Sequence, residues 1–396
     1  MKITSVEVFL GRVISMRINT DEGISGYGEI GLEYGCAHEA GFGQAIDFAK
    51  LIIGMDPFNI EAIWEHLHRD TFWGMGGGII VSAAMAAIDT ALWDIKGKAF
   101  NVPVYQLLGG KTNPKLRAYA SQLQFGWRKV QRETGREGML FDPQEYYDVV
   151  KEVVEEGYDA IKIDPIYVPT HRRPPAEVFA TMGTQHRGHM MQPDLVMAAE
   201  RIAAAREAGG ENMDIIIEVH SLLDTNTSVQ LGRALEPYRI MYYEEPTMPD
   251  NASNYRFIDR HCNIPLATGE RSSTRWGFRQ FFEDRTLSII QPDLCNTGGI
   301  TEAKKICDMA MVYDMGVQLH VCGGAIATAA ALHVETVIPN FVIHEWHTGC
   351  MMPDRVATGK YDYQPVNGYF TVPELPGIGQ EIGEEEERKA KKFVVK

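Results

Sequence analysis

Three short apolar runs in the middle of the chain each end in a glutamate. Glu218 ends Ile-Ile-Ile-Glu, Glu244 ends Met-Tyr-Tyr-Glu and Glu270 ends Leu-Ala-Thr-Gly-Glu. An unpaired buried carboxylate is costly, so three such endings at similar intervals suggest that these side chains share one cation. Carboxylate oxygens suit a hard divalent cation, and we predict Mg²⁺.

Ionisable residues end the neighbouring apolar runs as well. Side chains two positions apart on a strand point the same way, so Lys162 projects with Asp164 and Glu218 projects with His220. The adjacent residues Glu244 and Glu245 point in opposite directions, and only one of them can join the others. One such residue alone is usually a helix cap or half of an ion pair. The whole set indicates a catalytic site: Lys162, Asp164, Glu218, His220, Glu244, Glu270, Asp293, His320 and Glu345.

The runs that carry these residues alternate with amphipathic helices. The pattern predicts helices over 144–156, 193–208, 228–236, 301–313 and 326–337. It predicts strands over 116–121, 159–163, 214–219, 240–244, 265–268, 286–290, 316–320 and 341–344. Eight strands within 113–345 predict an α/β fold, a (β/α)8-type TIM barrel, whose functional groups gather at the carboxyl ends of the strands. A doubly wound sheet is the alternative, although it rarely needs eight such repeats.

Residues 1–112 are predicted to form an α+β capping domain. The first 30 residues alternate as a β-meander does, and helical periodicity follows over 46–53, 60–68 and 82–98. The irregular, charged segment 346–396 is expected to pack back on this domain. Two polar stretches rich in glycine or proline, Gly31–Gly43 and Pro165–Gln192, are predicted to be loops over the mouth of the barrel.

Composition narrows the class of protein. A formal net charge of −15 without a basic cluster argues against nucleic acid or an anionic membrane as a partner. The six cysteines form no C-x-x-C pair, which favours reduced thiols. The run His344–His347 lacks the spacing of the H-E-x-x-H zinc motif. The N-terminus has no signal-peptide core, and no apolar run approaches membrane-spanning length, so we expect a cytoplasmic enzyme or binding protein.

The sequence resembles the enolase superfamily, in its mandelate racemase/muconate lactonizing branch, and within that branch the acid-sugar dehydratases of the galactonate dehydratase type. The resemblance covers essentially the whole chain. It rests on Ala84–Asp94, Leu107–Gly110, Leu235–Tyr238, Glu244–Pro246, Gly269–Arg271, Gln291–Asp293 and Gly298–Thr301.

The resemblance implies a role for each matched residue. The Mg²⁺ ligands match Glu218, Glu244 and Glu270. The general base matches His320, the carboxylate that orients it matches Asp293, and the general acid of galactonate-type dehydratases matches His220. Glu345 matches a glutamate near the substrate carboxylate, and Lys162 matches the first lysine of the Lys-x-Lys pattern. The family is typically homo-oligomeric, and both a dimer and an octamer remain open.

Two positions depart from the family pattern. Position 218 holds glutamate where aspartate is common, and the longer side chain shifts the metal or the neighbouring histidine. Position 164 holds aspartate where racemases have their second lysine. The second base that two-sided racemisation needs is therefore missing from that strand, which favours a dehydratase.

The implied reaction removes water from a sugar acid, an aldonate or a related compound, to give a 2-keto-3-deoxy sugar acid. His320 would take the α-proton, while Mg²⁺, Lys162 and a protonated Glu345 would stabilise the enediolate. A charged His220 would protonate the departing 3-hydroxyl. Candidate substrate contacts are Asp164, Glu270, Arg271, Tyr34 and His38. A racemase or epimerase of a 2-hydroxy acid and a non-catalytic sugar-acid binder remain alternatives.

Overall fold

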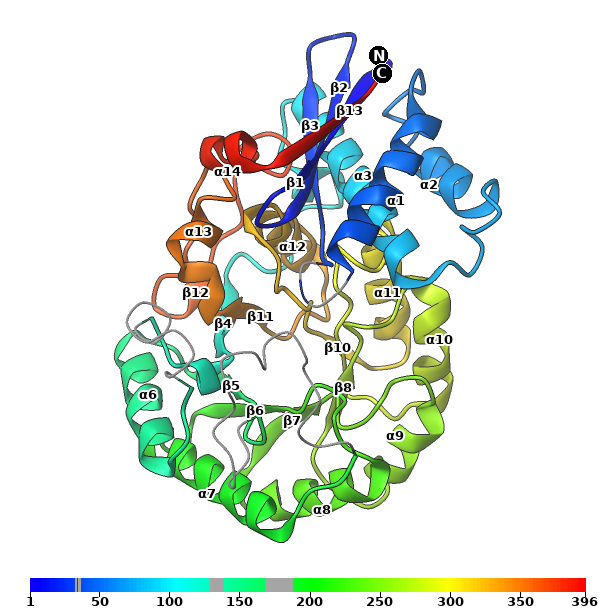
Figure 1. Cartoon of the computed structure of the whole chain (residues 1–396). Helices are drawn as coiled ribbons and strands as arrows, with labels where there is room; N and C mark the ends of the chain where they lie inside the picture. Colours follow the sequence, from blue (N-terminus) through cyan, green and yellow to red (C-terminus); the bar gives the residue numbers. More distant parts are fainter. Residues whose placement is uncertain (33, 35–36, 129–138, 168–187) are drawn as a thin grey trace.

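The computed structural model describes residues 1–32, 34, 37–128, 139–167 and 188–396. In Figure 1 the chain forms a closed ring of strands and helices with a smaller unit above it, and the two termini lie together at the top of that unit. Most of the predicted loop Pro165–Gln192 falls outside the described residues, as do positions 33, 35 and 36 of the predicted loop Gly31–Gly43.

The upper unit is built on a four-stranded antiparallel sheet in the order β13-β1-β2-β3. Three of its strands come from the N-terminus, β1 (Ile3–Leu10), β2 (Ile14–Thr20) and β3 (Ser25–Ile30), and the fourth is the C-terminal strand β13 (Lys391–Val395). The helices are α1 (His38–Ile52), α2 (Ile60–Arg69), α3 (Gly78–Ala99) and the short α4 (Val104–Leu107). The C-terminal segment thus returns across the molecule to complete the capping sheet (Figure 1).

The ring is a barrel of parallel strands. In chain order they are β4 (Leu116–Ser121), β5 (Ala160–Ile163), β6 (Asp214–Glu218), β7 (Ile240–Glu244), β8 (Leu266–Thr268), β9 (Ile289–Ile290), β10 (Gly316–Val317) and β11 (His344–His347). Sequence neighbours pair in parallel from β4 to β10, and β11 pairs with β4. The ring closes where the backbone N–H of Val317 donates to the carbonyl of Asn340 at 2.8 Å and the N–H of Val342 donates to the carbonyl of Val317 at 2.9 Å.

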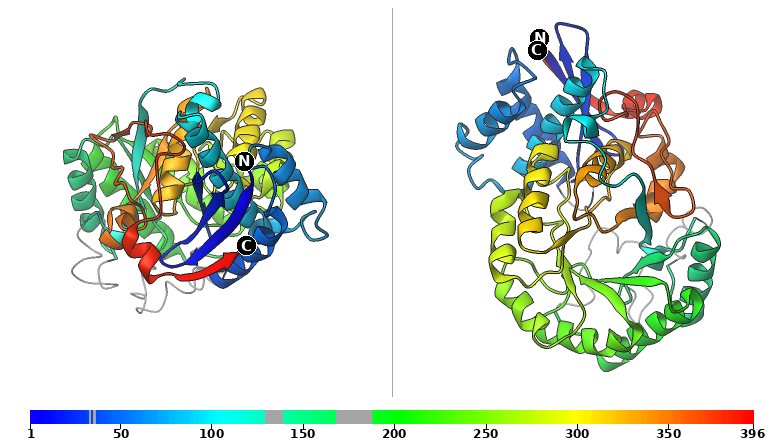
Figure 2. Two further views of the ribbon diagram at one scale, coloured as in Figure 1. Left: turned by 90° about the horizontal axis from the view of Figure 1, so that it is seen from above. Right: turned by 180° about the vertical axis from the view of Figure 1, so that it is seen from behind.

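Helices cover the outside of the ring (Figure 2). They are α6 (Pro143–Glu155), α7 (Gln192–Gly209), α8 (Thr225–Leu235), α9 (Ala252–Asp259), α10 (Thr274–Asp284), α11 (Gly299–Val312) and α12 (Ala325–Val337). The remaining short elements are η1 (Leu123–Phe125), η4 (Glu236–Tyr238), η5 (Thr348–Met351), α13 (Pro353–Val356), β12 (Tyr369–Phe370) and α14 (Glu384–Lys389). The predicted α/β barrel with an N-terminal cap is therefore confirmed.

Several predicted boundaries differ from the structure. The predicted eighth strand, 341–344, is shifted: Phe341 pairs with Val317 of β10, and the segment joins β4 only from His344 onward. The predicted loop Gly31–Gly43 ends early because α1 begins at His38. Helices α9 and α10 lie between predicted strands, where the alternation requires helices although it gives no range for these two.

The interior of the barrel is filled by side chains from alternating strand positions. Its buried cluster comprises Tyr119, Ala160, Ile216, Tyr242, Ala267, Ile289 and Ile343. This packing makes the barrel a solid core with a functional face at the carboxyl ends of the strands.

Helix α3 corrects the expectation that no apolar run approaches membrane-spanning length. By length and composition it is apolar enough to cross a bilayer, yet 78% of its apolar window is buried inside the protein. Small residues such as Ala84, Ala87 and Ala91 let it pack closely on β3 and α1. It is the central core helix of the cap.

The cap is hydrogen-bonded to the barrel through buried groups. The Ser82 hydroxyl donates to the carbonyl of Asn296 at 2.6 Å, and the Asp89 carboxylate accepts from the backbone N–H of Thr301 at 2.9 Å. Glu29 of β3 accepts from the backbone N–H groups of Gly324 and Ala327 at the start of α12. The cap therefore contacts the loops that follow β9 and β10.

Candidate active site

The three glutamates named by the sequence converge at one point. Glu218 and Glu244 are register neighbours at the ends of β6 and β7, and Glu270 follows β8. One carboxylate oxygen from each lies within 4.8 Å of the other two. Oε2 of Glu218 and Oε2 of Glu244 are buried and have no hydrogen-bond partner among the described residues. This set of oxygen donors fits Mg²⁺.

The closeness of the glutamates to one another affects their pKa values. Burial, together with the charges of Glu270 and Glu245, raises the pKa of Glu218 to about 8 against the opposing effect of Lys162. Burial and the adjacent Glu218 carboxylate also raise the pKa of Glu244 well above its usual range. A divalent cation would relieve this repulsion without requiring protonation.

We expect the stability of the protein to depend on both pH and Mg²⁺. Without a cation, folded Glu218 retains a proton that the unfolded chain has already lost at pH 7, so stability falls as pH rises through about 8. Integrated from pH 7 to pH 9, this costs about 1 kcal/mol. Thermal unfolding in chelator should show a lower Tm at pH 9 than at pH 7. Added Mg²⁺ should raise Tm more at pH 9, and Glu218→Gln should flatten the slope. An unchanged Mg²⁺ effect across this range would contradict the expectation.

His320 lies beyond β10 and forms a histidine–aspartate pair. Its Nδ1 contacts Oδ2 of Asp293 at 2.7 Å, and its Nε2 lies 3.3 Å from Oε2 of Glu270. Although burial opposes it, the carboxylates of Glu270, Asp293 and Glu345 raise the pKa of His320 well above its ordinary value. The pair with Asp293 fixes Nδ1 as the protonated nitrogen and directs Nε2 toward the glutamates.

A second histidine–aspartate pair lies on the opposite side of the barrel. Nδ1 of His220 contacts Oδ2 of Asp164 at 2.8 Å. The backbone of His220 is left-handed, with φ of 47°, and its N–H donates to Oε1 of Glu218 at 2.6 Å. Asp164 is fully buried and is not among the residues that line the cavity; its carboxylate contacts His220 and accepts from the backbone N–H of Ile166. Its role as a substrate contact stays a prediction.

Lys162 and Glu345 form a buried ion pair beneath the histidines. Nζ of Lys162 lies 2.7 Å from Oε1 of Glu345 and 2.8 Å from Oε1 of Glu244, and the lysine is only 1% exposed. Glu345 also accepts from the Ser121 hydroxyl and from the backbone N–H of Val321. Although burial opposes it, Lys162 and His320 hold the pKa of Glu345 well below its usual range. A protonated Glu345 is expected only if its site raises the pKa, and this condition is not met, because Lys162, the Ser121 hydroxyl and the N–H of Val321 all donate to its carboxylate.

A cavity opens above these groups, between the cap and the barrel. Its lining includes the predicted catalytic residues His220 and His320 and three of the predicted substrate contacts, Glu270, Arg271 and Tyr34. Their roles toward substrate stay predictions. The Arg271 guanidinium lies 2.9 Å from Oε2 of Glu245 and 3.1 Å from Oε1 of Glu270, so it bridges these two carboxylates, and Glu245 is not part of the converging group of three. His38 begins α1 and is not among the lining residues, and its substrate contact stays a prediction.

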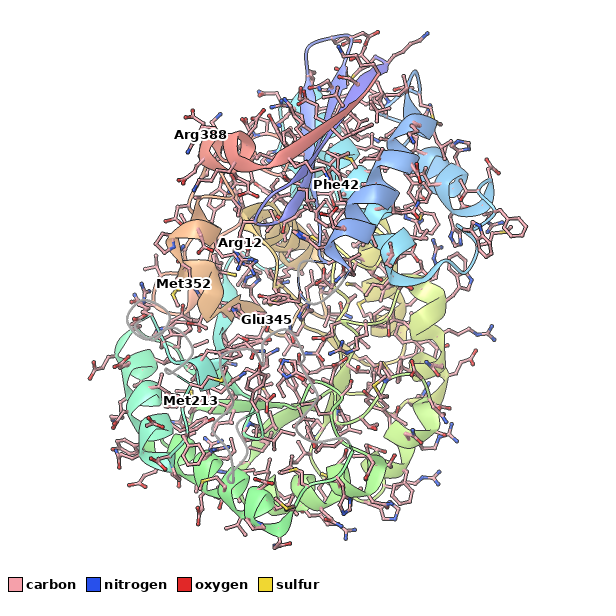
Figure 3. All side chains as sticks on the ribbon, viewed as in Figure 1. Arg12, Phe42, Met213, Glu345, Met352 and Arg388 are labelled. Carbon is pink, nitrogen blue, oxygen red and sulfur yellow. The ribbon has the colours of Figure 1, made fainter. Side chains whose placement is uncertain are left out.

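Sequence reasoning missed several polar lining residues, among them Arg12, Gln122, His347 and Arg355. Figure 3 shows Arg12, Met352 and Glu345 at the junction of the capping sheet and the barrel. His347 lies two positions beyond Glu345 on β11, and the same spacing rule that paired other strand-end residues could have found it. Gln122 directly follows β4, but a neutral amide carries no charge signal. Nothing in the local sequence marks Arg12 or Arg355.

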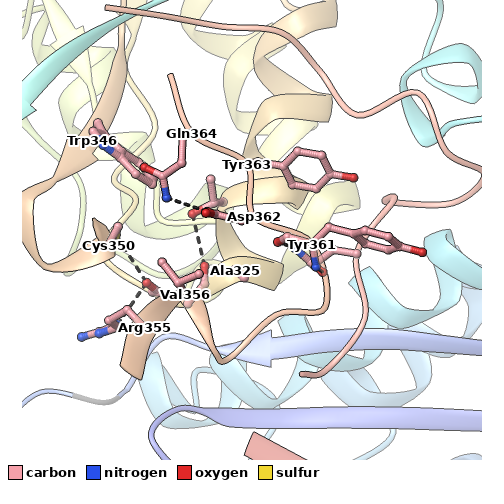
Figure 4. Close-up of a pocket in the computed structure, with 13 residues that line it drawn as sticks. Ala325, Trp346, Cys350, Arg355, Val356, Tyr361, Asp362, Tyr363 and Gln364 are labelled. Carbon is pink, nitrogen blue, oxygen red and sulfur yellow. Dashed lines mark hydrogen bonds between the residues drawn. The ribbon is translucent and has the colours of Figure 1, made fainter. Parts of the chain in front are cut away.

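The C-terminal segment supports the loop that follows His320. Figure 4 shows Arg355 and Cys350 approaching the same barrel loop, and Nη1 of Arg355 donates to the carbonyl of Gly323 at 3.0 Å. Nη2 of Arg355 donates to the hydroxyl of Tyr34 at 2.9 Å. One guanidinium thus connects the cap to the loop that carries His320.

Comparison with known families matches both halves of the chain. Residues 1–109 match the N-terminal domain of the mandelate racemase/muconate lactonizing enzymes. Residues 145–386 match the family described as enolase C-terminal domain-like. Together the two matches cover most of the sequence.

Individual relatives match over nearly their whole length. A D-galactonate dehydratase from Pectobacterium atrosepticum is 36% identical, over 97% of this chain and 93% of the relative. A solved member of the enolase superfamily from Salmonella Typhimurium is 51% identical with a TM-score of 0.93, covering 100% of both chains. A proposed dehydratase from Zymomonas mobilis ZM4 is 43% identical with a TM-score of 0.94, covering 100% of this chain and 99% of that one.

Proposed function

The chain belongs to the enolase superfamily, in its mandelate racemase/muconate lactonizing enzyme branch, and from this we propose that it is a Mg²⁺-dependent dehydratase of sugar acids. The proposed product is a 2-keto-3-deoxy sugar acid. The observation that carries the proposal is the pair of histidines, His220 and His320, each held by an aspartate at the edge of one cavity that also contains Glu270. The D-galactonate dehydratase relative makes aldonates the first substrate class to test.

His320 acts as the general base. Because Nδ1–H donates to Asp293, Nε2 is the nitrogen that would take the proton on C2 of the substrate. Its lone pair would become available when a cation held by Glu270 reduces the carboxylate charge that raises the pKa of His320. When held by Glu218, Glu244 and Glu270, Mg²⁺ supplies Lewis-acid stabilisation of the negative charge that develops on the substrate carboxylate. The ion pair of Lys162 with Glu345 keeps Glu345 ionised and fixed beside His320.

His220 acts as the general acid. It follows the third barrel strand and His320 follows the seventh, so the two side chains approach the cavity from opposite sides of the eight-stranded ring. A substrate between them can lose the C2 proton to one histidine and receive a proton on the departing 3-hydroxyl from the other. Leu32 and Tyr34 line the cavity from the cap side.

The experiment that tests this function is a screen of sugar acids. Aldonates and aldarates of varied configuration are incubated with the protein and Mg²⁺, and 2-keto-3-deoxy products are detected by their semicarbazone absorbance and by NMR. We expect turnover of at least one aldonate, abolished by chelator and restored by Mg²⁺. No product from the panel would refute the dehydratase assignment.

An epimerase is the second candidate, because two opposed histidine–aspartate pairs permit proton transfer at either face of C2. In D2O an epimerase would place deuterium at C2 and invert the configuration without loss of water. A non-catalytic sugar-acid binder would do neither. The same NMR spectra therefore separate the three functions.

Asp164→Asn is expected to lower kcat for dehydration by about 10–100-fold with little change in KM. The asparagine amide would face Nδ1 of His220 either with its nitrogen, which donates, or with its oxygen, which accepts more weakly than a carboxylate. Both disturb the tautomer and orientation of His220, whereas the residues that line the cavity are unchanged. Steady-state kinetics on the best substrate from the screen would measure the effect. Asp148→Asn, on an exposed helix position, is the control. A kcat equal to wild type would rule out the positioning role of Asp164.

A further inference from the structure

Gln122 occupies a strained position at the edge of the cavity. It directly follows β4, its φ of 65° is left-handed, and it is 7% exposed. The side chain lines the cavity, and its Nε2 lies 3.3 Å from Nε2 of His220. A non-glycine residue in this conformation is costly and is retained where the surrounding structure holds it for a purpose.

The orientation of its amide is determined by a chain of hydrogen bonds that begins at the backbone. The N–H of Asp164 can only donate, so the atom of Gln124 that faces it at 3.2 Å is the oxygen. The amide nitrogen of Gln124 must then face Gln122, where it donates to Oε1. Gln122 consequently turns its NH2 group toward His220 and the cavity.

We propose that Gln122 binds the departing 3-hydroxyl of the substrate and thereby selects its configuration at C3, an inference that rests on the proposed dehydratase function. The NH2 group and Nε2 of His220 converge on one point of the cavity wall. When His220 is protonated, its Nε2–H and the NH2 group of Gln122 are both donors and must separate. A hydroxyl oxygen that enters between them accepts a hydrogen bond from Gln122 while His220 delivers its proton to that oxygen. A hydroxyl of the opposite configuration points away from both groups.

Gln124 acts through Gln122 and is a positioning residue. It is fully buried, does not line the cavity, and contacts Asp164 and Gln122. Glutamate at position 124 would still accept from the N–H of Asp164 but has no hydrogen to donate to Oε1 of Gln122. The Gln122 amide would then lose its imposed orientation although no cavity residue has changed.

The test compares Gln122→Glu, Gln124→Glu and Gln124→Leu with wild type on two sugar acids that differ only at C3. We expect each variant to lower kcat/KM for the preferred epimer by about 100-fold and to reduce the discrimination between epimers by at least about tenfold. Exchange of the C2 proton with D2O, which depends on His320, should stay within about threefold of wild type. Far-ultraviolet circular dichroism and thermal unfolding identify any variant that fails to fold.

The outcomes distinguish a failure of the proposed role of Gln122 from a failure of the proposed dehydratase function. Wild type that dehydrates no sugar acid refutes the dehydratase. In that case the role of Gln122 at a departing hydroxyl is refuted with it. If wild type is active, folded Gln122→Glu with unchanged epimer preference overturns the inference. So does an equal loss of dehydration and C2 exchange, which indicates a general structural defect.

Discussion

Replacing His320 by asparagine is expected to reduce dehydration by about 10³-fold or more and to abolish exchange of the C2 proton. Proton transfer by a positioned side chain contributes on the order of 10²–10⁴-fold, and among the described residues no other imidazole pairs with Asp293. Asparagine keeps the size of the side chain near the Asp293 carboxylate but cannot take a proton. Keto-acid formation and ¹H NMR in D2O measure the two losses together.

The matched control for this variant is His333→Asn. His333 is a fully buried histidine of α12, and burial lowers its pKa to about 4, so it is neutral and lies outside the cavity. If the polar substitution itself disrupts the fold, both variants should lose activity. If His320 is the base, only His320→Asn should lose dehydration and C2 exchange. Exchange at C2 that continues near the wild-type rate in His320→Asn would exclude His320 as the base.

Replacing His220 by asparagine is expected to separate the two halves of the reaction. Dehydration should fall by about 10²–10⁴-fold because the 3-hydroxyl no longer receives a proton. Exchange at C2 should continue, since His320 and Asp293 are unchanged and lie across the barrel from position 220. Deuterium would therefore enter the recovered substrate in the absence of product.

This dissociation also distinguishes the epimerase. If His220 serves as a second base at C2, His220→Asn should retain exchange for only one C2 epimer and lose it for the other. Retention of full dehydration in His220→Asn would remove the residue from the mechanism altogether. Measuring exchange on both epimers, with product formation alongside, covers each possibility.

Much of the barrel and of its charged rim could be predicted because both follow from short-range rules. Apolar runs alternating with amphipathic helices indicate the repeat, and a carboxylate at the end of a buried run indicates an unusual environment. Glu218, Glu244 and Glu270 carry that signal, and the structure brings them together. The shifted eighth strand shows the limit of the rule, since a continuous apolar run does not say which neighbour each residue pairs with.

The partners of the site residues could not be predicted in the same way. Asp164 projects from the same strand face as Lys162, but its contact with His220 depends on a left-handed backbone at His220 and Ser221 that no glycine marks. The ionised state of Glu345 depends mainly on Lys162 and His320, and Lys162 is remote from it in sequence. Gln122 carries no charge, and its orientation follows only from which atoms donate and which accept in the hydrogen bonds from Asp164 through Gln124.

The buried contacts between the cap and the barrel bear on how such proteins can be recombined. Glu29 holds the start of α12, and Ser82 and Asp89 hold the loop after β9. A chimaera that takes its cap from one relative and its barrel from another would leave these backbone N–H and carbonyl groups without their partners in the interior. The cap and the two loops beside His320 therefore form one structural unit. Substrate specificity is best transferred between relatives by exchanging all three segments together.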